Sequence, residues 1–255
     1  MTPDPMTLST GQTVEFPVDL EATMLGAVYS APRAPVDALL PGGVQPIRAT
    51  PGGDDAVTFL SVEHHDIGVN GIDPYDEFGV IVPATHGATT VPYLSPLTRA
   101  TSGYVWYLPV TTEPARALGV DVWGFPKVVA DITHEDEGSQ RRTTVSIDGE
   151  RFVTMLVDRP PSIHRQDDGY SYSVRDGALL YTPADIDAEI GGWPFTDAVA
   201  VTLGEHDRAE VLRDLNLGLD GRALARIALD GTVRFHPREP LAANESRDLD
   251  GAALD

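Results

Sequence analysis

Glycine and proline interrupt this chain at short intervals, and their spacing limits the kinds of fold that it can form. The chain of 255 residues contains 24 glycines and 21 prolines. Both residues disfavour the interior of helices and strands and favour turns, so the stretches between them are short. Short stretches bounded by turns are typical of a β-rich fold. The predicted strands are Met24–Ser30, Val57–His64, Phe78–Pro83, Thr90–Leu94, Gly103–Val110, Val128–His134, Arg142–Ile147, Phe152–Asp158, Tyr170–Val174, Ala198–Leu203 and Thr232–His236.

One hairpin is predicted from local sequence. The run Thr143–Ile147 is followed by Asp148 and Gly149, and then by the apolar run Phe152–Val157. Asp-Gly between two strand-like runs favours a tight turn with positive φ angles, so these runs are expected to pair as antiparallel neighbours.

Few segments are expected to be helical, namely Pro35–Leu40, Glu113–Leu118 after Thr112, Pro183–Ile190 after Thr182, and Asp207–Leu215. In the second of these, Thr112 is placed to cap the helix and Gly119 to end it. Strands do not alternate with helices, which argues against a doubly wound parallel fold. The predicted fold class is α+β and β-rich, with a large antiparallel sheet closed into a barrel or cone and a few peripheral helices. We expect a single domain over residues 13–240, with residues 1–12 and 241–255 as flexible termini.

The charge of the chain is strongly negative, which excludes several kinds of partner. It has 39 acidic and 18 basic residues and a net charge of −21. Phosphate backbones and anionic membranes attract basic surfaces, so no nucleic-acid or membrane partner is expected. Acidic residues spread over the whole chain predict a halophilic protein, because about 1 M salt shortens the Debye length to about 3 Å and screens their repulsion. The chain has no cysteine and no signal-peptide pattern at Met1–Gln12, so we expect a cytoplasmic protein without disulfides.

Lys127 is the only lysine in the chain, whereas the other seventeen basic residues are arginines. Arginine replaces lysine as a surface charge, but it cannot become a neutral amine near pH 7. Attack of a neutral amine on a carbonyl is therefore the task that requires lysine, and Lys127 is a candidate nucleophile. The alternative interpretation is a surface lysine without a catalytic role.

The neighbours of Lys127 indicate how its amine could be activated. A free lysine has a pKa near 10.4, so only about one in 2,500 is neutral at pH 7. Burial disfavours the charged form, and Trp123, Phe125, Val128 and Val129 are apolar. We expect these side chains to lower the pKa of Lys127 by excluding water.

The best candidate for a metal site is the run Glu63-His64-His65-Asp66. On a strand, adjacent side chains point to opposite faces, so His64 and His65 cannot readily bind one ion. A surface or core role is expected for these histidines, and no metal is predicted.

The segment Gly119-Val120-Asp121-Val122-Trp123-Gly124-Phe125-Pro126-Lys127 resembles the signature of the acetoacetate decarboxylase superfamily. The resemblance extends upstream through Tyr104, Tyr107 and Glu113-Pro114-Ala115, and Tyr75-Asp76-Glu77 is similar to the Tyr-x-Glu element of the family. It implies that Lys127 forms a Schiff base with a small-molecule keto acid and that Glu77 is a second catalytic residue. It also implies substrate contacts from Trp123, Phe125, Phe59, Tyr75 and Arg99, assembly into a homo-oligomer, and no cofactor, because the imine itself is the electron sink.

Three departures from the family pattern bear on the reaction. Pro126 and Val128 flank Lys127 where the decarboxylases usually have a second lysine, and Leu60 replaces a second active-site glutamate. The early arginine of the family has no counterpart near Ala22, so Arg33, Arg48 or Arg99 remain as candidates for binding a carboxylate. The predicted function is decarboxylation of acetoacetate or a related β-keto acid. The alternatives are aldolase-dehydratase or other keto-acid imine chemistry, and a non-enzymatic barrel that binds an apolar ligand.

Overall fold

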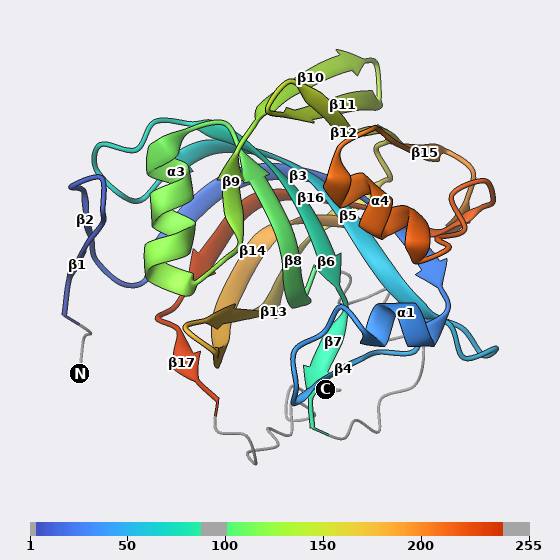
Figure 1. Ribbon diagram of the computed structural model, residues 1–255. Helices are drawn as coiled ribbons and strands as arrows, with labels where there is room; N and C mark the ends of the chain where they lie inside the picture. The colour runs from blue at the N-terminus through green and yellow to red at the C-terminus, as the bar shows by residue number, and fades with distance from the viewer. Residues whose placement is uncertain (1–3, 88–100, 242–255) are drawn as a thin grey trace.

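A nine-stranded sheet forms the centre of the computed structural model, which describes residues 4–87 and 101–241 (Figure 1). In spatial order its strands are β13 (Ser162–Arg175), β14 (Ala178–Thr196), β16 (Ala223–Phe235), β3 (Val18–Ala31), β5 (Asp55–Ile67), β6 (Tyr75–Val82), β8 (Gly103–Val110) and β9 (Lys127–Val129), and β17 (Glu239–Pro240) pairs with β14.

The strand pairings of this sheet run in a closed ring. β13 and β8 close it by pairing in parallel through Ser171 with Gly103 and Tyr172 with Tyr104. The later part of β8 pairs in parallel with β9 instead, which places Lys127 beside Leu108. The predicted β-rich fold class is confirmed. These two pairings are parallel in an otherwise antiparallel ring.

A second sheet covers part of the ring and contains β10 (Asp131–Glu137), β11 (Gln140–Ile147), β12 (Glu150–Asp158) and β15 (Val199–Leu203). It lies at the top of Figure 1. β11 and β12 form the predicted hairpin. Asp148 and Gly149 have φ angles of 52° and 83°, as the tight turn requires.

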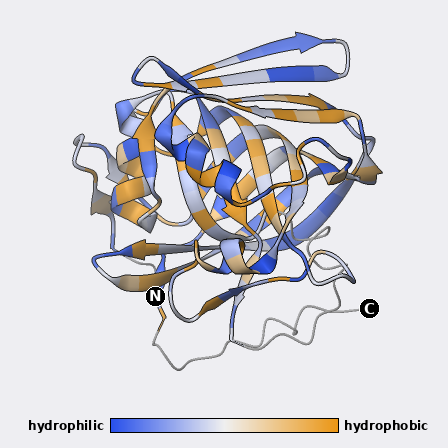
Figure 2. Cartoon of the chain, turned by 45° about the vertical axis from the view of Figure 1, so that its right-hand side comes forward, coloured by the Kyte–Doolittle hydropathy of each residue, from blue (hydrophilic) through white to orange (hydrophobic). Residues whose placement is uncertain are grey.

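Each strand of the ring presents alternate residues to two different environments, as the two-residue period of a strand dictates. Tyr29, Phe59 and Phe78 pack in a large cluster that also includes Phe152 and Met155 of the second sheet. Residues one position away in the sequence face the inside of the ring, and they form a smaller apolar cluster with Ala22, Val28, Leu60, Val62 and Ile227. The resulting bands of apolar and polar residues along the strands are visible in Figure 2.

The helices are short and lie at the edge of the sheets. They are α1 (Arg33–Asp37), α3 (Glu113–Ala117) and α4 (Asp207–Asp214). As predicted, Thr112 caps α3, since its hydroxyl accepts a hydrogen bond of 3.3 Å from the backbone N–H of Ala115. The helix does not end at Gly119, however. A π-helical turn, η1 (Leu118–Trp123), continues it to Gly124, whose φ angle of 69° ends the helix in the left-handed conformation that glycine adopts readily.

The predicted helix at Pro183–Ile190 is wrong, because these residues lie within β14 between β13 and β16. Ala184, Ile186, Ala188 and Ile190 alternate with acidic residues, a two-residue period that outweighs the helix-start signal of Thr182 and Pro183. The predicted strand Val128–His134 is divided at Ala130 into β9 and β10. Thr90–Leu94 lies outside the described residues, and the other predicted strands are confirmed, several of them longer than expected.

The described termini and a small outer sheet complete the fold. β1 (Met6–Thr7) pairs with β2 (Thr13–Val14), and β4 (Val44–Pro46) pairs with β7 (Ala84–His86). Leu8 is buried between β1 and β2, so the chain is packed ahead of residue 13. The domain limits at residues 13 and 240 stay a prediction. Within the described ranges, no helix is long and apolar enough to cross a membrane.

Candidate active site

Lys127 lies at the start of β9 with its side chain almost completely buried, at 4% exposure. The methylenes of this side chain run against Gly119 of η1. A Cβ atom at Gly119 would come within 2.4 Å of Cδ and Cε of Lys127, far below a normal contact distance. Gly119 therefore provides the space through which the lysine reaches the interior, and the π-helical turn brings this glycine to it.

The amine of Lys127 meets two residues of β6. Nζ lies 2.7 Å from Oε2 of Glu77 and donates a hydrogen bond of 3.4 Å to the hydroxyl of Tyr75. Nζ also lies 5.2 Å from the centre of the Tyr75 ring. Tyr75 and Glu77 are two positions apart on one strand, so both side chains point to the same face. The Tyr-x-Glu spacing noted in the sequence is thus the spacing that brings both side chains to the amine.

The ion pair sets the protonation of the site. Burial alone raises the pKa of Glu77, but the Lys127 ammonium and His64 together outweigh burial and lower this pKa to about 2. For Lys127, burial lowers the pKa, but the Glu77 carboxylate and Tyr75 together outweigh it, so the pKa of Lys127 is raised. Burial raises the pKa of Tyr75 to about 12. The expected lowering of the Lys127 pKa by burial is therefore wrong for the unliganded site, because a carboxylate lies against the amine.

The predicted desolvating role of the two valines is also wrong. Val128 points to the opposite face of β9 and packs against the cluster between the two sheets. Val129 is 43% exposed. Water is excluded from the amine by Tyr75 and by the turn at Gly119 instead.

His64 belongs to the site and was not predicted there. It lies opposite Tyr75 in the β5–β6 pairing, and the two rings stack with centres 4.4 Å apart. Its Nε2 lies 3.9 Å from Oε2 of Glu77, and neither ring nitrogen has a hydrogen-bond partner among the described residues. His65 points to the other face, as predicted, and its Nε2 lies 2.9 Å from the hydroxyl of Thr23. The described part of the chain contains no group of three or more side chains that could hold a metal ion.

Trp123 and Phe125 are core residues of the motif. Their rings stack with centres 5.7 Å apart, and Phe235 packs against both. The indole N–H of Trp123 donates a hydrogen bond of 3.0 Å to the carbonyl of His236. These contacts fix the turn that precedes Lys127, and neither ring lines the cavity described below.

The structure does not bring Phe59 to Lys127. Phe59 faces the second sheet, in contact with Tyr29 and Phe78, whereas its neighbour Leu60 faces the inside of the ring. The strand period assigns Phe59 to the outer face, and a substrate contact from it stays a prediction.

Neither Arg33 nor Arg48, two of the arginines proposed for carboxylate binding, is placed at Lys127. Arg33 pairs with Asp55 at 3.5 Å, and Arg48 is exposed near the same carboxylate. Asp55 begins β5, whereas Val62, the partner of Glu77, lies seven residues further on, about 23 Å along a strand. Arg99 lies outside the described residues.

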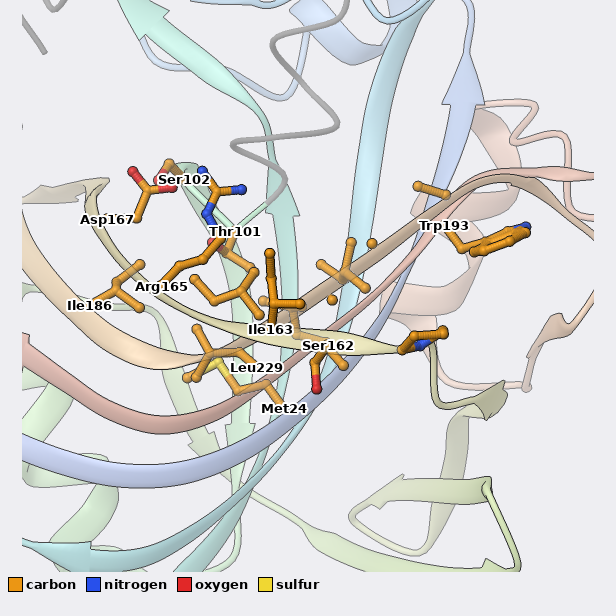
Figure 3. Close-up of a pocket in the computed structure, with 18 of the residues that line it drawn as sticks. Met24, Thr101, Ser102, Ser162, Ile163, Arg165, Asp167, Ile186, Trp193 and Leu229 are labelled. Atoms are coloured by element: carbon orange, nitrogen blue, oxygen red, sulfur yellow. The ribbon is translucent and has the colours of Figure 1, made fainter. Parts of the chain in front are cut away.

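A cavity of about 470 Å³ lies between strands of the ring (Figure 3). Met24 and Leu60 line it from inside the ring. Met24 pairs with Val62, and Val62 pairs with Glu77 on the next strand, so the cavity wall and the carboxylate share one row of side chains. Lys127 and Glu77 are not part of the lining.

Comparisons with known proteins identify the family of the chain. The sequence model of the acetoacetate decarboxylase (ADC) family matches residues 3–169. The chain belongs to the acetoacetate decarboxylase family. No curated protein matches it in a sequence search.

Solved structures of low sequence identity share the fold. The acetoacetate decarboxylase from Legionella pneumophila superposes with a TM-score of 0.63 at 16% identity, over 89% of this chain and 87% of that one. The enduracididine biosynthesis enzyme MppR complexed with pyruvate gives 0.67 at 14%, over 96% and 93%. An acetoacetate decarboxylase-like enzyme from Sphingomonas wittichii RW1 gives 0.64 at 15%, over 95% and 100%.

Proposed function

We propose that this protein is a carbon–carbon lyase that decarboxylates acetoacetate or a related β-keto acid through an imine on Lys127. The observation that carries the proposal is the contact of 2.7 Å between the only lysine of the chain and a buried carboxylate, at the position of the family signature. A buried lysine with an adjacent acid–base group is the arrangement required of an amine nucleophile. Acetoacetate decarboxylase is itself a well-known example of a lysine activated by its surroundings. Family membership and the chemistry of the lysine are therefore not two independent lines of support.

The proposed reaction starts with a proton transfer. Glu77 takes a proton from the Lys127 ammonium, and the neutral amine attacks the ketone carbon. The resulting carbinolamine loses water, for which Glu77 returns the proton, and a protonated imine remains. The bond to the carboxylate then breaks, its electron pair moves into the imine to form an enamine, and carbon dioxide leaves. Protonation of the enamine carbon and hydrolysis of the imine release the ketone and regenerate Lys127.

Glu77 holds the amine as ammonium in the unliganded site, so substrate entry must shift the proton. A ketone that displaces the remaining water weakens the solvation of both charges, and this favours the neutral amine and carboxylic acid over the ion pair. His64 offers two ring nitrogens without partners in the described structure, and either can bond to the oxygen that leaves the carbinolamine.

A second candidate is aldol condensation and dehydration of a keto acid on the same lysine. It is favoured by Leu60, an apolar residue where the decarboxylases of the family have a second glutamate. A similar fold in MppR complexed with pyruvate is consistent with it. Both candidates use the imine, and they differ in the bond that breaks afterwards.

Reductive trapping tests the shared step. The protein is incubated with acetoacetate or pyruvate, borohydride is added, and the intact mass is measured. One adduct that maps to Lys127 rather than to the N-terminal amine is expected, and carbon dioxide release separates the two candidates. Lys127→Arg should give no adduct at this position and no turnover while the far-ultraviolet circular dichroism stays that of the wild type. Unchanged turnover in this variant would refute the imine on Lys127, whereas no adduct and no turnover with any small keto acid would leave the binding of an apolar ligand as the function.

A further inference from the structure

The cavity between strands of the ring is larger and more apolar than a four-carbon keto acid needs. Cavities of about 300–1,000 Å³ hold drug-sized ligands, and this one measures about 470 Å³. Its wall contains Met24, Leu60, Ile186, Ile227 and Leu229. A ligand that fills it must therefore carry a substantial apolar part.

The mouth of the cavity combines apolar and charged side chains. Ile163 and Trp193 line it although they are 67% and 53% exposed, so water reaches the cavity here. In Figure 3, Arg165 and Asp167 lie at one end of the lining residues and Trp193 at the other. The mouth is thus suited to a ligand that has one polar end.

Arg165, which lines the cavity, and Arg48, which does not, are exposed arginines without an ion-pair or hydrogen-bond partner among the described residues. Arg165 has no ion pair, hydrogen bond or ring contact within residues 4–87 and 101–241, although acidic residues outnumber basic ones about twofold. The nearby acidic groups are engaged elsewhere. Asp167 accepts a hydrogen bond of 2.9 Å from the backbone N–H of Asp168, and Asp187 accepts one of 2.9 Å from Gln166. A guanidinium without a partner at a cavity mouth is available to a carboxylate of the ligand.

Arg165 lines the same cavity as Met24 and Leu60. Met24 pairs with Val62, and Val62 pairs with Glu77 on the next strand. Arg165 thus opens onto the cavity whose wall leads to Glu77, whereas Arg33 and Arg48 do not line it.

We propose that Arg165 binds the carboxylate of the substrate and that the cavity holds an apolar body larger than that of acetoacetate. The substrate class is thus a keto acid with a medium-length alkyl or an aryl group. That the substrate carries a reacting ketone rests on the proposed function. The binding of a carboxylate and of an apolar body in the cavity does not depend on it.

Unreactive carboxylates test this inference without any imine chemistry. Calorimetry measures the binding of butanoate, hexanoate, octanoate and decanoate to the wild-type protein and to Arg165→Gln. Affinity should rise with chain length from butanoate to octanoate, and Arg165→Gln should weaken octanoate binding about tenfold or more, as expected for the loss of a charge-assisted hydrogen bond. The matched control is Arg48→Gln, which removes an exposed arginine outside the cavity and should leave binding unchanged.

Uncharged and cationic ligands of the same length identify the role of the charge. Octanol should bind equally well to the wild type and to Arg165→Gln, and octylamine should bind the wild type more weakly than octanoate does. Tighter binding of octylamine, equal binding of octanoate to both proteins, or no binding of any chain length would overturn the inference.

The same experiments separate this inference from the proposed function. Octanoate binding that depends on Arg165, together with no borohydride adduct, would support the cavity and refute the imine. An adduct on Lys127 together with no dependence of octanoate binding on Arg165 would support the imine and refute Arg165 as the carboxylate-binding residue. If both hold, turnover of keto acids should favour longer chains, and Arg165→Gln should raise KM more than it lowers kcat.

Discussion

Replacement of Glu77 by glutamine should reverse the direction in which the Lys127 pKa is shifted. In the wild type, the carboxylate 2.7 Å from Nζ raises this pKa against the opposing effect of burial. Glutamine keeps the size of the side chain but removes the charge. Burial then prevails, so the pKa of Lys127 in Glu77→Gln should lie below the ordinary lysine value.

The magnitude follows from the geometry of the pair. Two unit charges 2.7 Å apart attract by about 6 kcal/mol at an effective dielectric constant of about 20. Desolvation of the two ions offsets part of this attraction, but loss of one partner leaves the other charge buried and uncompensated. Breaking a buried pair in this way typically costs about 3–5 kcal/mol, and we expect a loss of this size in the free energy of unfolding of Glu77→Gln at pH 7.

The dependence on pH should distinguish the variant from the wild type. The lowered pKa of Glu77 contributes stability above the usual carboxyl range, which is lost as the pH falls towards about 2. The raised pKa of Lys127 contributes stability that is lost only as the pH rises through that raised value. In Glu77→Gln, a lowered Lys127 pKa costs stability below it, so the variant should regain stability between pH 7 and pH 10 while the wild type does not.

A single lysine makes the measurement direct. Protein labelled with ¹³C or ¹⁵N at the lysine side chain gives one resonance, whose titration reports the pKa of Lys127, and thermal unfolding from pH 6 to 10 reports stability. Glu63→Gln is the control, because Glu63 pairs with Arg141 at 2.8 Å on the opposite face of the adjacent strand. If the Lys127 pKa stayed above the ordinary lysine value in Glu77→Gln, the account of the ion pair would be refuted.

Three further predictions concern the support of the amine and the charge of the chain. Gly119→Ala should lower turnover about 100-fold or more and cost about 1–3 kcal/mol of stability, because the added Cβ displaces the Lys127 methylenes. Gly42→Ala is the control, since Gly42 has open space around it. Equal kinetics of the two variants would contradict this reasoning. Val128→Glu should leave the pH profile of activity in place, since Val128 faces away from the amine, and a shift of that profile to higher pH would contradict this placement. The net charge of −21 predicts that the unfolding temperature rises from dilute buffer to about 1 M salt, and full stability in dilute buffer, measured by calorimetry, would show that the acidity is not an adaptation to salt.

Several parts of the site could be predicted because they depend on residue type and on short-range spacing. A sole lysine among seventeen arginines indicates amine chemistry wherever it lies in the fold. Tyr75 and Glu77 are two positions apart, and any strand brings such residues to one face. The Asp148-Gly149 turn sets the register of its hairpin for a similarly local reason.

Other parts could not be predicted, because alternation along a strand does not tell which face lies inside the ring. Phe59 and Leu60 are adjacent, and only packing of the second sheet against Phe59 assigns Leu60 to the interior. His64 joins the site through its pairing with Tyr75 on another strand. In Ala184–Ile190 the alternating pattern favours a strand and the Thr182-Pro183 signal favours a helix start, and pairing with strands on both sides resolves the conflict.

The residues that carry the chemistry can be read from the chain before it folds, because the amine, the carboxylate and the two-residue period of strands are properties of the covalent chain. The protonation state of the amine cannot be read from the chain in this way. The pKa of Lys127 depends on the carboxylate of Glu77, which is fifty residues away in the sequence but has Oε2 2.7 Å from Nζ in space. The arginine that reaches the cavity is likewise a result of folding, because Arg165 of β13 and Met24 of β3 line one cavity only once the ring has formed. Electrostatic interactions act through distance in space, and a sequence specifies that distance only once the chain has folded.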